Sequence, residues 1–463
     1  MNGGRTLFSG TNRDQWTQLK LNDLCVHITS GGTPSRRVPT YYIDGVHPWV
    51  KTQELADTWI NNTEEHITAE AIAQSSAKIL PKNTVLVAMY GATVGKLGLL
   101  RQPMTCNQAC CALIVDDQKA DYRFIFYQLL QDRDRLKNLA TGAAQQNLSG
   151  EVIKSLKFWI PPLPEQRRIA HILGTLDDKI ENNRKTAKTL EAMAKAIFKS
   201  WFVDFDPVRA KMAGESPESI CKRLKLTPEI LDLFPDRLVD SELGEIPEGW
   251  KVRPLGAMFG FQNGYAFKSD DWQDYGVPVI KIGSVKPGLV DLSNVSYVSE
   301  EVANQAKEYQ LLPADLVISM TGYVGEVGLV PKASVYPMLN QRVGRIVLDG
   351  RGTQHVSFAY CLTRQSAFKN AVEIKAHGTA QANVSSSAIM SINTVAPTNT
   401  LRSAFDRLCA INFDELLTAH ETAMIILKLR DILLPKLISG EIRVSDAQAV
   451  VDTAANTSKL VHD

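Results

Sequence analysis

The amino-acid sequence repeats itself once along its 463 residues, and this repeat limits the folds that the chain can adopt. Trp16 matches Trp250 at an offset of 234 residues, and Gly142 matches Gly378 at an offset of 236. The other matches are Gly31 with Gly264, and 48–51 with 278–281, 89–99 with 320–329, 107–108 with 340–341 and 142–149 with 378–385. Solenoids need at least three repeats, so two copies predict two similar lobes with approximate two-fold symmetry.

The offset divides each copy into two parts. Before residue 142 the offset varies between 230 and 234 residues, and from residue 142 onward it stays at 236. Small insertions therefore distinguish the first parts of the two copies, whereas the second parts share one fixed length. This pattern predicts a variable globular domain followed by a constant element in each copy.

The variable parts contain short runs that are rich in β-branched residues and bounded by proline and glycine. These runs lie at 84–89, 112–115, 315–320 and 344–348. Helical patterns are fewer and lie at 122–139 and 356–372. The sequence therefore predicts an α+β fold class, with one loop-rich α/β domain in each copy.

The constant parts carry heptad stripes, which are typical of long helices that pack on each other. The stripe of the first copy is interrupted at Asn183 and consists of Ile169, Leu173, Leu176, Ile180, Ala187, Leu190, Ala194, Ile197 and Trp201. The stripe of the second copy contains Leu416, Ile426, Leu433 and Leu437, with Asn412 and Arg430 at core positions. Each helix of about 38 residues would be ~57 Å long. We expect the two helices to pack antiparallel as a coiled coil.

These patterns give a complete domain plan. The plan has a first globular domain at 1–160, a first long helix at 161–205, a connector at 206–249, a second globular domain at 250–397, a second long helix at 398–440 and a flexible tail at 441–463. The connector includes a possible short helix at 228–234. The tail is small and polar, which predicts a frayed end.

No motif in the sequence indicates a catalytic or metal site. The segment 91–96 resembles a phosphate-binding loop, but it has three residues rather than four between its glycines, and Leu97 replaces the magnesium-binding Ser or Thr. A glycine-rich turn between two strands explains it better. Cys106, Cys110 and Cys111 have no histidine pair nearby, so we expect buried free thiols rather than zinc ligands.

Composition and charge place the chain among ordinary globular proteins. Its 51 Lys and Arg residues against 50 Asp and Glu residues give a net charge of +1, which excludes a histone-like polycation. The sequence shows no signal peptide and no run of ~18 apolar residues. Seven scattered cysteines suggest reduced thiols, so we expect a cytoplasmic protein.

Binding to DNA is the function that the remaining polar loops could serve, since Arg, Lys, Asn and Gln read base edges in the major groove. The candidate DNA-binding residues are Thr33, Ser35, Arg36, Arg37, Lys51, Thr52, Gln53 and Lys96 in the first copy, and Lys268, Lys281, Ser284, Thr321, Tyr323 and Arg342 in the second. Asn107, Gln108, Asn340 and Gln341 recur in both copies. Their recurrence favours a role in the shared fold, because specificity must differ between the copies.

Several motifs in a fixed order resemble the DNA-specificity (S) subunit of type I restriction–modification systems. They are PPLPEQRRIA at 161–170, LDDKI at 176–180, KSWFVDFDPV at 199–208, GEIPEGW at 244–250 and LPKLISGEI at 434–442. The resemblance covers residues 16 to about 443. The second copy departs from it at 396–401, where APTNTL replaces the PPLPEQ run.

The resemblance implies two target-recognition domains, each reading one part of a split, asymmetric DNA site. It implies that the helices set the spacer between the parts and dock two methyltransferase subunits, and that motor–nuclease subunits complete the restriction enzyme. The chain itself would be non-catalytic and hold no cofactor. Partner subunits would bind S-adenosylmethionine for methylation, and ATP and magnesium for restriction. Two alternatives are a scaffold with two lobes that do not bind DNA, and the specificity part of a single-site methyltransferase.

Overall fold

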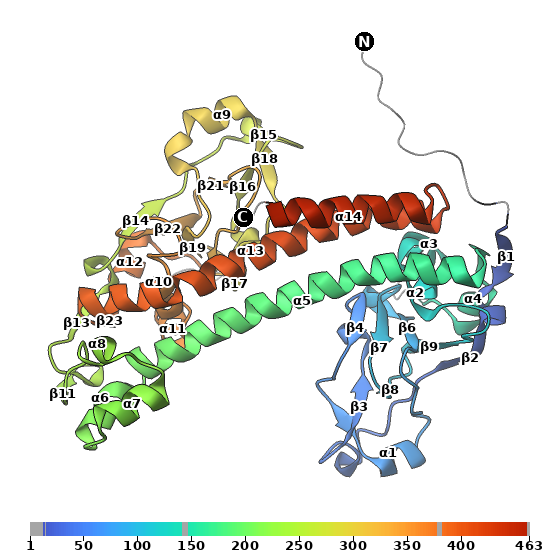
Figure 1. Ribbon diagram of the computed structural model, residues 1–463, viewed down its shortest axis with the longest axis horizontal. Coiled ribbons are helices and arrows are strands. Elements are labelled where there is room, and N and C mark those ends of the chain that lie inside the picture. The colour runs from blue at the N-terminus through green and yellow to red at the C-terminus, as the bar shows by residue number, and fades with distance from the viewer. Residues whose placement is uncertain (1–12, 14, 141–146, 377–381, 461–463) are drawn as a thin grey trace. The chain divides into compact units, whose positions relative to one another are not determined.

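The computed structural model describes residues 13, 15–140, 147–376 and 382–460, with side chains as far as residue 453 (Figure 1). The chain divides into two compact units. The first unit comprises 1–180 and 425–463, and the second comprises 181–424. Parts of the repeated segments 142–149 and 378–385 lie outside the described residues.

Two helices of equal length pass through both units. Helix α5 (Leu163–Phe202) and helix α13 (Asn399–Ile438) each have 40 residues. Pro164 lies in the first turn of α5, where its missing N–H is not needed. Gly440, with φ +71°, follows the end of α13 and allows the left-handed turn there. The prediction of two long helices is confirmed, with bounds that differ by a few residues from 161–205 and 398–440.

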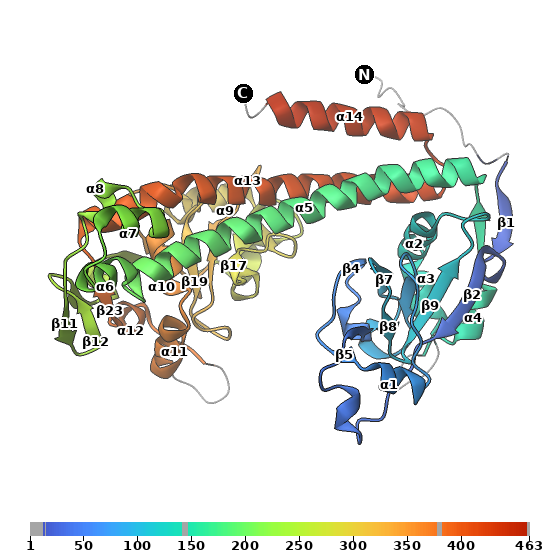
Figure 2. The same cartoon turned by 60° about the horizontal axis from the view of Figure 1, so that its bottom comes forward.

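Within each unit, a segment of α5 lies beside a segment of α13 (Figure 1, Figure 2). In the first unit, Asp177 of α5 is paired with Arg430 of α13 at 2.9 Å. In the second unit, the rings of Trp201 and Phe405 lie 5.7 Å apart, and burial together with the nearby charge of Arg184 on α5 lowers the pKa of His420 on α13. Because α5 advances from 184 to 201 in this unit while α13 goes back from 420 to 405, the pairing there is antiparallel.

The first unit is built on a five-stranded sheet with the strand order β2-β9-β6-β7-β4. Its strands are β2 (Cys25–Ser30), β4 (Thr58–Ile60), β6 (Val85–Ala88), β7 (Leu97–Leu100) and β9 (Cys110–Val115). A smaller sheet has the order β5-β3-β8, with β3 (His47–Val50), β5 (His66–Ile67) and β8 (Thr105–Cys106). Antiparallel β1 (Thr17–Lys20) and β10 (Lys157–Ile160) close the domain just before α5.

Short helices cover this sheet and connect it to the long helices. They are α1 (Ala69–Ala73), α2 (Tyr122–Gln131), α3 (Arg133–Leu139) and α4 (Gly150–Ser155). Buried side chains of α2 such as Phe124 share one hydrophobic core with Leu173 of α5 and Leu437 of α13. The sheet domain therefore rests on both long helices through a continuous apolar core.

The second unit repeats this plan, with one additional strand, β15 (Trp272–Gln273), in its smaller sheet. Its five-stranded sheet has the order β14-β22-β19-β20-β17, which matches β2-β9-β6-β7-β4 position by position. The strands are β14 (Gly260–Asn263), β17 (Gly288–Leu289), β19 (Leu316–Ser319), β20 (Val327–Leu329) and β22 (Val343–Val347). The second sheet, β15-β18-β16-β21, contains β15 (Trp272–Gln273), β16 (Val277–Ile280), β18 (Ser296–Val298) and β21 (Met338–Leu339). The sequence repeat is thus a repeat of folded domains.

The remaining elements of the second unit include the connector between the copies. The helices of the repeated domain are α9 (Glu300–Gln305), α10 (Ser357–Thr363), α11 (Ser366–Lys375) and α12 (Ser386–Met390), and its closing strands are β13 (Lys251–Pro254) and β23 (Asn393–Ala396). The connector forms α6 (Asp206–Met212), α7 (Pro217–Leu224), α8 (Pro228–Leu231), β11 (Leu238–Ser241) and β12 (Gly244–Pro247). Its core is aromatic, with Phe234 packed edge-on against Trp201 at 5.4 Å.

Most side chains of the predicted stripes lie inside. Ile169, Leu173, Leu176, Ile180, Trp201, Leu416, Leu433 and Leu437 are buried. Leu190, Ile197 and Ile426 are half-buried and pack at the edge of a core. The stripe therefore located the packed face of each helix, although it left out the deeply buried Phe198.

Two expectations from the sequence are wrong. The end of the chain is not simply a frayed tail, because Val444–Leu460 forms helix α14 and buries Ala447 and Val451 in the core of the first unit. The single helices expected at 122–139 and 356–372 are each divided into two. Helix α2 stops at Asp132, where α3 begins, and α10 and α11 are separated by 364–365.

Candidate nucleic-acid interface

In the first unit, Arg36 is held against an aromatic pair. Its guanidinium carbon lies 4.1 Å from the centre of the Tyr42 ring and 5.2 Å from that of Trp49. The guanidinium also pairs with Glu65 at 2.6 Å, and this bond raises the pKa of Arg36 and lowers that of Glu65. Because Trp49 donates its indole N–H to the carbonyl of Gly32 at 3.0 Å, the loop that carries Thr33 and Ser35 is fixed on this platform.

Lys51 belongs to the same cluster. Its ammonium group pairs with Glu65 at 3.0 Å and with Glu64 at 3.1 Å, and these bonds raise its pKa. The charges of Arg36 and Lys51 are thus partly neutralised within the domain. The neighbouring candidates Ser35, Arg37 and Gln53 are exposed, and Thr33 and Thr52 are half-buried.

Lys96 lies in the glycine-rich turn between β6 and β7 and faces the carboxylate of Asp57 at 3.1 Å. Asp57 also accepts a hydrogen bond from Arg133 of α3. Gly91 and Gly95 have φ of +68° and +78°, conformations that favour glycine. The turn is therefore structural, as predicted, and Lys96 helps to hold it to the rest of the domain.

The matching turn of the second unit uses reversed charges. Glu326 stands where the first copy has Lys96, and it pairs with Lys369 of α11. Gly322 and Gly325 again have positive φ, +73° and +79°. An ion pair ties the turn to a helix in both copies, although the residues that supply the charges differ.

The basic candidates of the second unit have different surroundings. The ammonium of Lys281 lies 3.7 Å from the centre of the Trp272 ring and donates to the Ser296 hydroxyl at 2.7 Å. Partial burial lowers the pKa of Lys281. Lys268 is exposed, and its backbone N–H donates to Asp271. Ser284 is buried, so it does not present a side chain to a ligand.

Of the three further candidates of the second unit, Thr321 and Arg342 line one hollow, and Tyr323 does not. Thr321 is buried and donates its hydroxyl to the side-chain oxygen of Asn383 at 2.7 Å. Tyr323, at the tip of the glycine-rich turn, is 62% exposed, with the ammonium of Lys286 5.6 Å from its ring centre. Arg342 is exposed at the start of β22.

Corresponding grooves lie on the two domains. The groove of the first unit has a volume of about 480 Å³, and that of the second has about 470 Å³. Residues at matching positions line both, namely Met89 and Met320, Tyr90 and Thr321, Gln108 and Gln341, Asn147 and Asn383, and Ser149 and Ser385. These linings are polar and supply both hydrogen-bond donors and acceptors.

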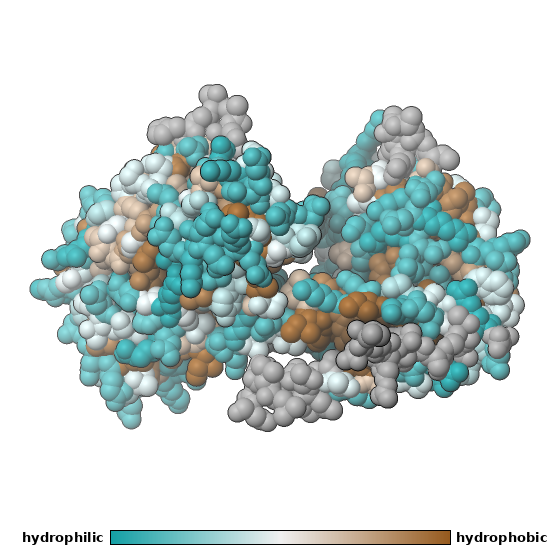
Figure 3. Space-filling model, turned by 90° about the horizontal axis from the view of Figure 1, so that it is seen from above, coloured by the Kyte–Doolittle hydropathy of each residue, from teal (hydrophilic) through white to brown (hydrophobic). Residues whose placement is uncertain are grey.

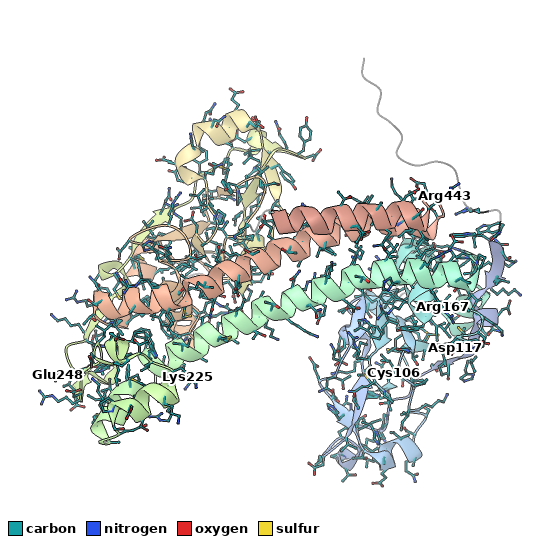
Figure 4. The ribbon with its side chains drawn as sticks, viewed as in Figure 1. Cys106, Asp117, Arg167, Lys225, Glu248 and Arg443 are labelled. Carbon is teal, nitrogen blue, oxygen red and sulfur yellow. The ribbon has the colours of Figure 1, made fainter. Side chains whose placement is uncertain are left out.

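A somewhat larger groove of about 530 Å³ in the first unit has an unsuitable charge for DNA. Asp116, Asp117 and Asp121 line it together with Lys82 and Arg167. The Arg167 guanidinium donates to the carbonyl of Asp117 at 3.2 Å, where the loop before α2 meets the start of α5 (Figure 4). Three carboxylates in one groove would repel a phosphate backbone, so we place the interface elsewhere.

The cysteines and the outer surface add no competing site. Cys106, Cys110 and Cys111 are buried free thiols, and burial raises the pKa of Cys111 to about 12. Within the described residues, no cluster of three or more metal-binding side chains is present, and no helix is long and apolar enough to cross a membrane. Hydrophilic side chains cover most of the surface seen in Figure 3.

Comparison with known proteins identifies the family. The sequence model described as "Type I restriction modification DNA specificity domain" matches the chain twice, at 13–192 and 247–397. The chain belongs to this family. Each match covers one globular domain, and the first continues into α5.

Relatives of this specificity-domain protein match along most of its length. The type I restriction enzyme MjaIX specificity subunit of Methanocaldococcus jannaschii is 25% identical over 93% of this chain and 94% of its own length. The HindI specificity subunit of Haemophilus influenzae is 29% identical over 63% of this chain and 70% of its own. The crystal structure of the S subunit from M. genitalium has the same fold, with a TM-score of 0.57 and 18% identity over 93% of this chain and 98% of that one.

The groove residues Tyr90, Asn147 and Asn383 were not among the candidates that we took from the sequence. A signal for the two asparagines was present, since both lie in the repeated segments that begin at 142 and 378. Repetition alone could not show that these segments form the wall of a groove. The assignment of individual side chains to DNA contact stays a prediction.

Proposed function

We propose that this chain is the DNA-recognition subunit of a type I restriction–modification complex, and that each domain reads one part of a bipartite DNA site. The observation that carries the proposal is the double match of the specificity-domain family, once in each folded domain. One recognition domain would serve a continuous site. Two similar domains with different loop residues suit a site in two different parts.

The long helices supply the spacer in this proposal. An α-helix of 40 residues is about 60 Å long, whereas one turn of duplex DNA is about 34 Å. The two helices have equal length, and the insertions between the copies are confined to the globular domains. We infer that the helices set the number of base pairs between the two parts of the site.

Each unit also offers an apolar patch to a partner subunit on the outer side of α13. Leu408 and Ile411 are 43% and 69% exposed in the second unit, and Ile425 and Ile432 are 57% and 59% exposed in the first. These side chains follow one another at spacings of three, fourteen and seven residues, so they lie along one side of the helix. Two patches suit two methyltransferase subunits.

The partners supply the chemistry in this account. We propose that the methyltransferase subunits bind S-adenosylmethionine and methylate adenine, and that motor–nuclease subunits use ATP and magnesium for restriction. The role of this chain is to bind DNA, orient the partners and choose the site. A cytoplasmic location follows from the same proposal, because the DNA and the partners are there.

Binding measurements with the assembled complex test the proposal. The full chain together with its methyltransferase subunits should prefer one bipartite sequence over scrambled DNA, and its affinity should fall steeply as salt rises. A scaffold that does not bind DNA would show neither behaviour. A single-site methyltransferase subunit would prefer one continuous sequence and would tolerate any change of the bases outside that sequence.

A further inference from the structure

The grooves of the two domains share one backbone framework. In the first unit, the Met89 N–H donates to the carbonyl of Ala109 at 2.8 Å. In the second unit, the Met320 N–H donates to the carbonyl of Arg342 at 3.0 Å. Ala109 and Arg342 therefore occupy the same structural position, directly after the repeated Asn-Gln pair. Arg342 lines the groove of the second unit, and Ala109 follows Gln108, which lines the groove of the first.

The opposite wall of each groove is also held in the same way. Leu148 donates its N–H to the carbonyl of Met89 at 2.8 Å, and Val384 donates its N–H to the carbonyl of Met320 at 2.9 Å. One isolated antiparallel bridge joins Tyr90 to Asn147, and an equivalent bridge joins Thr321 to Asn383. Differences between the grooves therefore come from side chains on a common backbone.

The side chains that differ are suited to distinguishing two DNA sequences. Gln108 and Gln341 are exposed in both grooves and cannot distinguish one domain from the other. Position 109 has only a methyl group, whereas position 342 carries an exposed guanidinium. Among the residues that the structure describes, none pairs with the Arg342 side chain, in contrast to Arg36, Lys51 and Lys96, which all face carboxylates.

An unpaired guanidinium beside amide groups is the chemistry that reads a guanine. Arginine forms two parallel hydrogen bonds to O6 and N7 of guanine in the major groove, and lysine lacks this planar fork. An alanine at the same position can contact only an apolar group such as the thymine methyl. The two domains would then differ at one base pair of their half-sites through this position alone.

We propose that the two grooves are the base-reading sites of the domains and that Arg342 is a specificity-determining residue that contacts a guanine in the second half-site. This inference rests on the proposed function of the chain. It identifies the part of each domain that faces base edges. Arg36, Lys51 and Lys96 are then residues that support the loops, since acidic neighbours neutralise them.

Methylation profiling of a library with randomised half-sites tests this assignment. We would assemble the full chain with its methyltransferase subunits and compare the wild type with Arg342→Ala and Arg342→Lys. In both variants, the preference for guanine at one position of one half-site should fall about tenfold. The preferences in the other half-site should stay unchanged. Ala109→Arg should alter the preference of the other half-site alone. Arg407→Ala, an exposed arginine of α13 outside the groove, should leave both half-sites unaltered.

Three outcomes would overturn the assignment. Arg342→Ala could leave all preferences unchanged, or it could weaken methylation of every sequence equally while Arg342→Lys restores it, which indicates a phosphate contact. Ala109→Arg could also leave the first half-site as it was. If the wild-type complex itself shows no bipartite preference, the proposed function fails as a whole, whereas a bipartite wild type with unaltered variants rejects only the role of Arg342.

Discussion

The Tyr127 hydroxyl donates a 2.6 Å hydrogen bond to the carboxylate of Asp177, whose other oxygen accepts from Arg430 at 2.9 Å. Tyr127 comes from α2 of the recognition domain, Asp177 from α5 and Arg430 from α13. One carboxylate thus joins the domain to both long helices. This contact explains the arginine that interrupts the apolar stripe of the second helix, because its charge is satisfied across the helix pair.

The second unit uses a tyrosine in a comparable way. The Tyr360 hydroxyl of α10 donates a 2.6 Å hydrogen bond to Glu191 of α5. Glu191 also pairs with Lys195 on the same helix. Both recognition domains are therefore anchored to α5 by a tyrosine and a carboxylate, although the two anchors lie at positions that do not match in the repeat.

Loss of Arg430 should destabilise the first unit. The Arg430 and Asp177 side chains are only 17% and 18% exposed, and a buried charge without its partner is costly. We expect Arg430→Ala to lower the free energy of unfolding by about 2 to 3 kcal/mol. Chemical denaturation of the full chain measures this change. The double variant Arg430→Met with Asp177→Asn removes both charges and keeps an acceptor oxygen for the Tyr127 hydroxyl, so it should recover much of the loss. A neutral Arg430→Ala would show that the pair does not support the helices.

Two equivalent glycines should be indispensable. A Cβ at Gly31 would lie 2.1 Å from the carbonyl oxygen of Cys106, and one at Gly264 would lie 2.0 Å from that of Asn340. Both atoms are backbone, so they cannot move aside. We expect Gly31→Ala and Gly264→Ala each to cost at least about 3 kcal/mol.

A matched glycine provides the control for this pair. A Cβ at Gly150 would meet no atom within 4 Å, so Gly150→Ala should change stability by less than about 0.5 kcal/mol. Thermal unfolding of the three variants gives the comparison. If Gly31→Ala and Gly264→Ala behaved differently from each other, the two domains would not share the close approach that the structure gives them.

The stability of the second unit should depend on pH through Asp406. Burial raises the pKa of this carboxyl group from 3.8 to about 6, although it accepts hydrogen bonds from the start of α10. A raised pKa means that the folded state holds the proton more tightly than the unfolded state does. The protonated Asp406 carboxyl group therefore stabilises the fold fully below about pH 4, and this stabilisation is lost as the pH rises to about 6. At about 1.4 kcal/mol per pKa unit, the loss is about 3 kcal/mol.

Substitution of Asp406 by asparagine isolates this effect. Asparagine keeps the acceptor oxygen for the Phe358 N–H and removes the titration. Between pH 4 and pH 6, the unfolding free energy of the wild type should fall relative to that of Asp406→Asn. Denaturation curves at several pH values check the slope, and parallel pH profiles for the two proteins would contradict it.

The exposed apolar patches of α13 should be needed for assembly and not for folding. Ile411→Asp and Ile425→Asp each place a charge in one patch. We expect either variant to weaken binding of one methyltransferase subunit by roughly tenfold or more, since buried apolar anchors dominate interfaces. Size-exclusion chromatography or titration calorimetry with the partner gives the stoichiometry. Ile374→Asp, an 83% exposed position on α11, is the matched control and should bind two partners normally. Unchanged assembly of both α13 variants would place the docking surface elsewhere.

The sequence predicted the parts of the fold that depend on periodicity and repetition. The repeat aligns Gly31 with Gly264, which make equivalent close backbone contacts in the structure, and the heptad stripe predicts that Ile169, Leu173 and Leu433 face inward. The division of the helix expected at 122–139 was missed because Asp132 ends α2 through a local change of direction that periodicity does not record. The buried Phe198 lies next to the stripe, because a helix inside a larger core buries a wider face than a coiled-coil seam.

The candidate site was harder to predict because its character depends on partners distant in sequence. Lys96 looks like a free cation in the sequence, but in the folded domain it pairs with Asp57, a carboxylate that also pairs with Arg133. Lys51 is neutralised by Glu64 and Glu65 through the pairing of loops. Arg342 appears equally basic in the sequence and differs in having no acidic partner in the part of the chain that the structure describes. Ion pairs between segments that are distant in sequence decide which basic side chains stay available to contact DNA. A local sequence pattern does not record these ion pairs.

The account rests on two recognition domains joined by helices of fixed length, and a change of helix length tests it most directly. One heptad inserted at residue 183 of α5 and one at residue 423 of α13 would lengthen each helix by about 10 Å, or roughly three base-pair steps of ~3.4 Å. Single-molecule sequencing of adenine methylation then gives the site that the complex recognises. We expect both half-sites to stay the same and the spacer to grow by about three base pairs. An unchanged spacer, or altered half-sites with the original spacer, would contradict the account.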